Sequence, residues 1–112
     1  MAKSINKSYS RYAREAAELL GLLIRNARIE RRLTVTELAE RAGVSRGLVN
    51  RVEKGEPGCT LGTAFELAAI VGVRLFDAEP TTLTRHLAAA KDKLSLLPRY
   101  ARPSTREAKD DF

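Results

Sequence analysis

Residues 34–55 read TVTELAERAGVSRGLVNRVEKG. The hydroxyl of Thr34 stands three residues before the carboxylate of Glu37, which is the spacing of a capping box. In a capping box, each side chain accepts a hydrogen bond from the backbone N–H of the other residue at the start of a helix. Gly43 can adopt the left-handed conformation that ends a helix, and a serine two positions later is a good cap for the next one. The stretch therefore predicts two short helices, over residues 35–42 and 46–54.

Hydrophobic residues recur at three- and four-residue spacing on both sides of this stretch, which is typical of amphipathic helices. The further helices expected are residues 9–32, 61–71 and 82–97. Between the last two, Val73 to Phe76 is apolar at alternate positions, which is compatible with a short strand. Such a strand needs a partner, which a second subunit can supply. We therefore predict an all-α, mainly helical fold with an extra C-terminal helix and at most one short strand, paired across a dimer.

Composition favours one soluble globular domain with an anionic partner. The chain has 112 residues, of which 44% are hydrophobic and 30% charged. Lys and Arg total 20 against 14 Asp and Glu. The whole excess lies in residues 1–54, where twelve basic residues stand against six acidic ones. This balance makes nucleic acid the first partner to consider.

Several classes of protein are disfavoured by the same sequence. One cysteine cannot form an internal disulfide, the first residues have no apolar run of the signal-peptide type, and no apolar stretch has the length to span a bilayer. We therefore expect a cytoplasmic protein without membrane contact. His86 has no second ligand nearby, so no metal site is expected. Without an acid–base pair or a phosphate-cradling glycine loop, neither an enzyme nor a cofactor is expected.

Two short helices joined by a glycine-containing turn are the arrangement of a helix-turn-helix motif. The major groove of double-stranded DNA is about 12 Å wide and admits one helix, whose N-terminal residues meet the base edges. Here Arg46 can bond guanine through two N–H groups, Asn50 can do the same with adenine, and Gly47 lets the backbone approach closely. The Ser45 hydroxyl suits a phosphate or a base acceptor.

Residues 20–73 resemble the lambda-repressor-like Xre helix-turn-helix domain. The resemblance is carried by Ile24 with Arg28 and Arg32, by Leu33-Thr34, by the run from Glu37 to Ser45, by Val49 and Val52 to Gly55, and by the closing segment 61–73.

This resemblance implies specific roles for individual residues. The implied base-reading residues are Arg46, Gly47, Asn50 and Arg51, the implied phosphate contacts are Thr36 and Ser45, and the implied structural ion pair is Arg28 with Glu53. The chain departs from the family at Val35, where the family usually has glutamine. The glutamine contact to the DNA backbone is therefore missing or is replaced by one from Thr36.

The C-terminal part is similar to HipB-type antitoxins, which are encoded beside HipA-type kinases. This similarity rests on Leu94 to Pro98, the basic linker that follows, and the final Asp110-Asp111-Phe112. It implies a homodimer that represses its own operon and holds a HipA-like kinase toxin in a complex. Two alternatives stay open: a stand-alone phage-like or metabolic Xre-type regulator without a toxin partner, and a protein-interaction module that no longer binds DNA. Arg46 and Arg51 argue against the second alternative.

Four segments are expected along the chain: a flexible arm over 1–8, a helix-turn-helix DNA-binding domain over 9–76, a dimerising C-terminal helix over 77–98 and a flexible tail over 99–112. The expected dimer interface comprises Val73, Leu75, Leu83, Leu87 and Leu94, because these apolar residues exceed what the small core needs. A symmetric dimer would read an inverted-repeat operator. In the tail, Asp110, Asp111 and Phe112 are either a solvated terminus or an anchor for the kinase.

Overall fold

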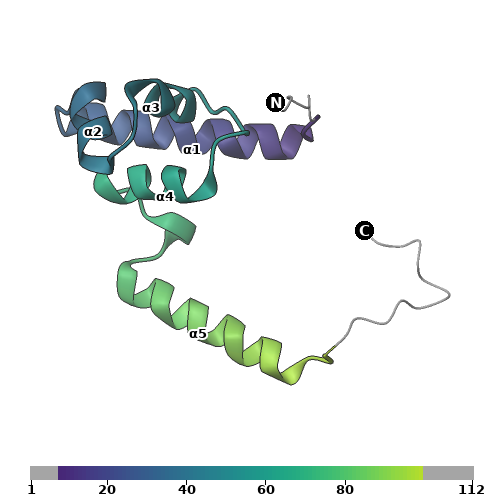
Figure 1. Ribbon diagram of the computed structural model, residues 1–112. Coiled ribbons are helices and arrows are strands. Elements are labelled where there is room, and N and C mark those ends of the chain that lie inside the picture. Colours follow the sequence, from purple (N-terminus) through teal and green to yellow (C-terminus); the bar gives the residue numbers. More distant parts are fainter. Residues whose placement is uncertain (1–7, 100–112) are drawn as a thin grey trace. The chain divides into compact units, whose positions relative to one another are not determined.

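The computed structural model describes residues 8–99. The helices are α1 (Arg11–Glu30), α2 (Val35–Ala42), α3 (Arg46–Glu53), α4 (Leu61–Ile70) and α5 (Pro80–Leu96), with a single 3-10 turn, η1 (Leu75–Asp77), before α5 (Figure 1). The all-α prediction is confirmed. The arm expected over 1–8 and the tail expected over 99–112 lie outside the described residues, apart from Ser8 and Arg99.

The short strand expected over Val73 to Phe76 is wrong, because this part of the chain forms the turn η1 instead. Phe76 has a φ of 57° and Asp77 a φ of 55°, both in the left-handed region. A strand requires an extended backbone at each residue, so the chain cannot continue as one through these positions. There is no strand within residues 8–99. The expected pairing of this segment with its copy in a second subunit is therefore not supported.

Local side-chain caps explain where α1 and α2 begin. Ser10 Oγ accepts a hydrogen bond from the Ala13 N–H at 3.1 Å, so α1 begins two residues later than the expected start at residue 9. Thr34 caps α2 through the expected capping box. Thr60 precedes α4 but makes no side-chain capping bond, and its hydroxyl donates to Thr63 Oγ1 at 2.8 Å.

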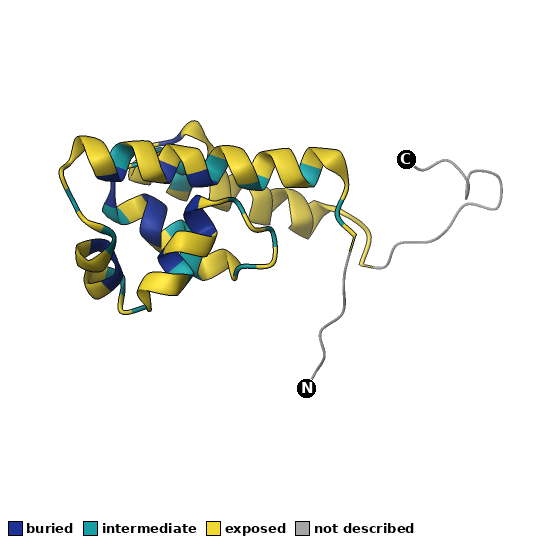
Figure 2. Ribbon diagram, turned by 90° about the horizontal axis from the view of Figure 1, so that it is seen from above, coloured by how far each residue is buried: buried dark blue, intermediate teal, exposed yellow. Residues whose placement is uncertain are grey.

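The core of the domain that ends at Asp77 includes a large, fully buried aliphatic side chain from each of four helices, packed with smaller buried residues such as Ala68 and Val52. The four large side chains are those of Ile24 of α1, Leu38 of α2, Val49 of α3 and Leu67 of α4, each 0% exposed. Figure 2 shows the buried residues on the sides of these helices that face one another. Leu61 fits the apolar period of the helix expected over 61–71, yet it is 68% exposed because it occupies the first turn of α4 and lies outside this core.

Close packing of α1 on α3 depends on a glycine. A Cβ atom on Gly21 would lie 2.8 Å from the carbonyl oxygen of Glu53 and closer still to that of Val52. Contacts this short between a Cβ atom and backbone atoms are essentially never seen. Gly21 therefore sets how closely α3 approaches α1.

The second unit of the chain begins at Ala78 and contains α5. This helix begins at Pro80, two residues before the expected start at residue 82, because proline is well suited to a first helical position. Of the α5 residues expected at the dimer interface, Leu87 is 55% and Leu94 69% accessible to solvent, while Leu83 is half-buried. Among the described residues, no helix is both long enough and apolar enough to cross a membrane.

Candidate nucleic-acid interface

The turn between α2 and α3 is built by Gly43 and Ser45. Gly43 has a φ of 71°, a left-handed conformation that glycine adopts without a steric penalty, and it ends α2. Val44 then donates its N–H to the Ala39 carbonyl at 3.0 Å, which folds the chain back on α2. Ser45 Oγ accepts a hydrogen bond from the Leu48 N–H at 3.1 Å and starts α3. Local hydrogen bonds therefore define the turn between the two short helices.

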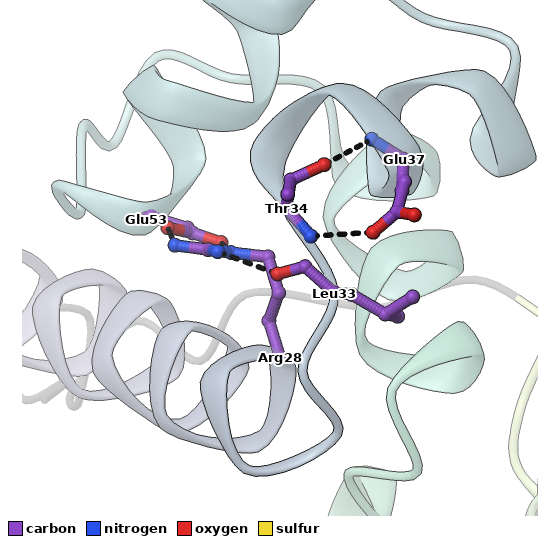
Figure 3. A network of polar contacts seen from close by, with 5 residues as sticks. All are labelled: Arg28, Leu33, Thr34, Glu37 and Glu53. Carbon is purple, nitrogen blue, oxygen red and sulfur yellow. Dashed lines mark hydrogen bonds and ion pairs between the residues drawn. The ribbon is translucent and has the colours of Figure 1, made fainter.

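A buried polar network holds these helices against α1 (Figure 3). Arg28 of α1 donates from Nε to Glu53 Oε2 at 2.7 Å and from Nη2 to Glu53 Oε1 at 3.0 Å. The same guanidinium donates from Nη1 to the carbonyl of Leu33 at 2.9 Å. Next along the chain, Thr34 and Glu37 exchange the two capping-box bonds at 2.8 and 3.0 Å. One arginine therefore links α1, the end of α3 and the loop that leads into α2.

The N-terminal ends of α2 and α3 share one surface hollow of about 540 Å³. The seven residues that line it are Thr34, Val35, Thr36, Ser45, Arg46, Gly47 and Asn50. Five of the six residues predicted to contact DNA are thus brought together in space. The sixth, Arg51, is not among the lining residues. Val35, at the position where the family usually has glutamine, also lines the hollow, and so does Thr34, which the sequence reasoning treated only as a helix cap.

The polar side chains of α3 in the hollow are available to a ligand. Arg46 and Asn50 are four residues apart, so they lie on the same face of the helix, and both are exposed. Neither side chain makes a hydrogen bond or an ion pair with another residue in the range 8–99. A guanidinium and an amide on one exposed face can each form two parallel hydrogen bonds to a base edge.

Backbone geometry adds to the preference of this surface for anions. The first N–H groups of a helix have no partner within the helix, and the helix dipole places partial positive charge at that end. Val35 and Thr36 open α2, while Arg46 and Gly47 open α3, and all four line the hollow. Two helix N-termini and one arginine therefore face the same space, which favours an anion such as a phosphate group.

Arg51 lies beside the hollow and not in it. Its Nε is 4.0 Å from Glu56 Oε1, in an ion pair whose side chains are both about half exposed. Its Nη1 would be 3.7 Å from a Cβ atom on Gly47, so the guanidinium extends along α3 toward the N-terminal end. Screening by solvent makes the pair with Glu56 weak, and Arg51 is free to exchange it for another anion.

The other predicted site residues lie outside this surface. Val73 and Leu75 are half-buried and pack against the core of their own domain, while Leu83, Leu87 and Leu94 belong to α5. The partner-binding residues expected in the tail, Asp110, Asp111 and Phe112, lie outside the described residues.

Comparison with known proteins agrees with this geometry. The family model described as Helix-turn-helix matches residues 24–77, which run from the second half of α1 to the end of η1. The match supports the assignment of this segment to the Xre and lambda-repressor-like helix-turn-helix domains, and it supports a DNA-binding transcriptional regulator. No curated protein and no solved structure matches the chain.

Proposed function

We propose that the protein is a sequence-specific transcriptional repressor that places the N-terminal end of α3 in the major groove of DNA. The observation that supports the proposal is the hollow between the starts of α2 and α3, where Arg46 and Asn50 are exposed and uncommitted. Arg46 forms two hydrogen bonds with a guanine, and Asn50 forms two with an adenine. Thr36 and Ser45 bond the flanking phosphates, together with the N–H groups at the two helix starts.

Gly47 and Arg51 complete the proposed contact surface. Gly47 has no side chain, so the start of α3 comes close to the groove floor, and Arg51 turns from Glu56 to the DNA. Arg28 and Glu53 take no part in base contact, because both are buried. They act by holding α3 in place.

Selection from random duplex DNA with the full-length chain tests this proposal. We expect enrichment of an inverted repeat whose half-sites are centred one helical turn apart, about 34 Å. Binding to the enriched duplex is expected to weaken steeply as salt rises, because the contacts to phosphate release counterions. A chain that enriches no sequence, or whose binding is indifferent to salt, would contradict the proposal.

The repressor acts as a homodimer through α5, in our proposal. The residues 83, 87, 90, 94 and 97 alternate spacings of four and three, which is the pattern of two helices packed along a hydrophobic seam. Leu87 and Leu94 are 55% and 69% exposed, so this seam is unfilled within the described residues. Leu87→Asp is expected to convert the dimer to a monomer in light scattering, whereas Leu96→Asp, off the seam, leaves it unchanged. A dimer that survives Leu87→Asp would contradict this interface.

The proposed partner of the dimer is a HipA-like kinase toxin, which makes the protein an antitoxin that regulates its own operon. This part of the proposal is supported by the similarity of the C-terminal segment to HipB-type antitoxins. Asp110, Asp111 and Phe112 would then serve as the anchor. Deletion of residues 108–112 is expected to weaken calorimetric affinity for the kinase encoded by the adjacent gene, with operator binding nearly unchanged. If the full-length and truncated chains bind the kinase with equal affinity, residues 108–112 do not contribute to the complex. If neither chain binds the kinase, the protein is a stand-alone regulator without a toxin partner.

A further inference from the structure

The DNA-facing hollow contains an aliphatic side chain that none of the roles above uses. Of the seven lining residues, Thr34, Thr36 and Ser45 carry hydroxyls, Arg46 a guanidinium and Asn50 an amide, while Gly47 carries no side chain. Val35 is the remaining one, and its two methyl groups can neither donate nor accept a hydrogen bond. It is half-buried, so part of its surface packs against the core and the rest lines the hollow.

The position of Val35 limits what it can recognise. It is the first residue of α2, and it lies in the same hollow as Arg46, the first residue of α3. An isopropyl group gains nothing from a phosphate oxygen, which needs a donor or a positive charge. The edges of the base pairs in the major groove offer one apolar group, the C5-methyl of thymine. Contact between the two removes apolar surface from water on both partners.

We infer that Val35 makes the site selective for a thymine next to the base pairs read by Arg46 and Asn50. The inference rests on the proposed function, because it assumes that α3 enters the major groove. Each half-site then combines two hydrogen-bonded base pairs with one thymine that is recognised through its methyl group. The side chain of Val35 makes this contact without rearranging, because its β-branched carbon leaves few rotamers and part of it is already packed.

Removal of one methyl group from the DNA tests the inference without any change in the protein. The probe is the duplex enriched by selection, in which deoxyuridine replaces each thymine of one half-site in turn. We expect one replacement to weaken binding about fourfold, the effect of losing one buried methyl group, and the others to have little effect. The protein is the full chain at a single salt concentration.

Variants of the protein then assign the contact to a residue. Val35→Ala is expected to bind the thymine and deoxyuridine duplexes equally, since it no longer reaches the methyl group. Thr34→Ser is the matched control: it removes a methyl group from the same hollow, keeps the hydroxyl that caps α2, and is expected to keep the full discrimination. If thermal melting shows that Val35→Ala is unfolded, Val35→Thr replaces it, keeps the shape of valine with one methyl group fewer, and is expected to lose at least half of the discrimination.

The possible outcomes separate this inference from the proposed function. An enriched operator on which no deoxyuridine replacement weakens binding would overturn the thymine contact and leave the repressor proposal standing. The same holds if the discrimination persists in Val35→Ala, or is lost in Thr34→Ser instead. If selection enriches no sequence, the proposed function itself fails and the thymine contact fails with it.

Discussion

Arg28 and Glu53 are 25 residues apart in the sequence and meet in a bidentate ion pair, with N···O distances of 2.7 and 3.0 Å. Their side chains are 11% and 5% exposed. A third bond, from Arg28 to the Leu33 carbonyl, joins the pair to the loop that precedes α2. The pair therefore connects the end of α1 to both helices that form the candidate DNA surface.

Loss of one partner of this pair is expected to destabilise the domain strongly. Glu53→Gln leaves the buried guanidinium of Arg28 without a counter-charge, which costs about 3–5 kcal/mol in the free energy of unfolding. Chemical denaturation followed by circular dichroism measures the loss. Arg11→Ala is the control, because the Arg11–Glu15 pair is exposed on both sides and contributes at most about 1 kcal/mol. Equal losses for the two variants would show that burial of the pair has no energetic consequence.

Replacement of Gly21 tests the close crossing of α1 and α3. Gly21→Ala places a Cβ atom against the backbone of Val52 and Glu53, so the helices must separate, and we expect a loss of about 1–3 kcal/mol. Gly62→Ala is the matched control, since a Cβ atom there meets nothing within 4 Å. It is expected to stabilise α4 by up to about 1 kcal/mol through helix propensity. Melting temperatures that move in the same direction for both variants would contradict this packing.

The capping box makes Thr34 more important for stability than Thr60, although both precede a helix. Thr34→Ala removes the bond to the Glu37 N–H and is expected to cost about 1 kcal/mol. Thr60→Ala removes no capping bond, so we expect a smaller loss. Denaturant midpoints compare the two directly. A larger effect at Thr60 would mean that the geometry of the α2 start has been misassigned.

Substitution of Gly47 by alanine is expected to change stability and DNA affinity in opposite directions. A Cβ atom on Gly47 meets only ordinary contacts, at 3.7 Å from Arg51 Nη1 and 3.9 Å from Ser45 Oγ, so Gly47→Ala is expected to fold and to gain up to about 1 kcal/mol in helix stability. The same methyl group would keep α3 away from the DNA, and we expect operator affinity to fall about tenfold. Gel-shift titration and thermal melting of one preparation check both effects. Unchanged affinity would place Gly47 outside the contact surface.

Features that depend on neighbouring residues were predictable from the sequence. The spacing of Thr34 and Glu37, the glycine at position 43 and the serine at position 45 each act within one turn of a helix. These local signals set the turn between α2 and α3. They also place the residues of the hollow at the helix starts, so most of the candidate site follows from local chemistry.

Features that depend on distant contacts were not predictable in the same way. The alternation over Val73 to Phe76 resembles a strand, but Val73 and Leu75 instead pack against their own core, and two left-handed residues follow. Leu61 fits the helical period of α4 yet points away from the core. The convergence of two helix N-termini on one hollow, which includes Val35, depends on how α2 packs against α3, and no single stretch of sequence contains it.

The central claim, that the start of α3 reads bases, is tested most directly by the base preferences of Arg46→Ala. Binding of wild type and variant is measured against every single-base substitution of the selected operator, with Arg11→Ala as the control for lost charge. We predict that Arg46→Ala loses about 1–3 kcal/mol on the selected operator and becomes indifferent to the base at one position of each half-site, with its other preferences intact. A variant that binds every duplex more weakly by the same factor, or that binds the operator as wild type does, would contradict the claim.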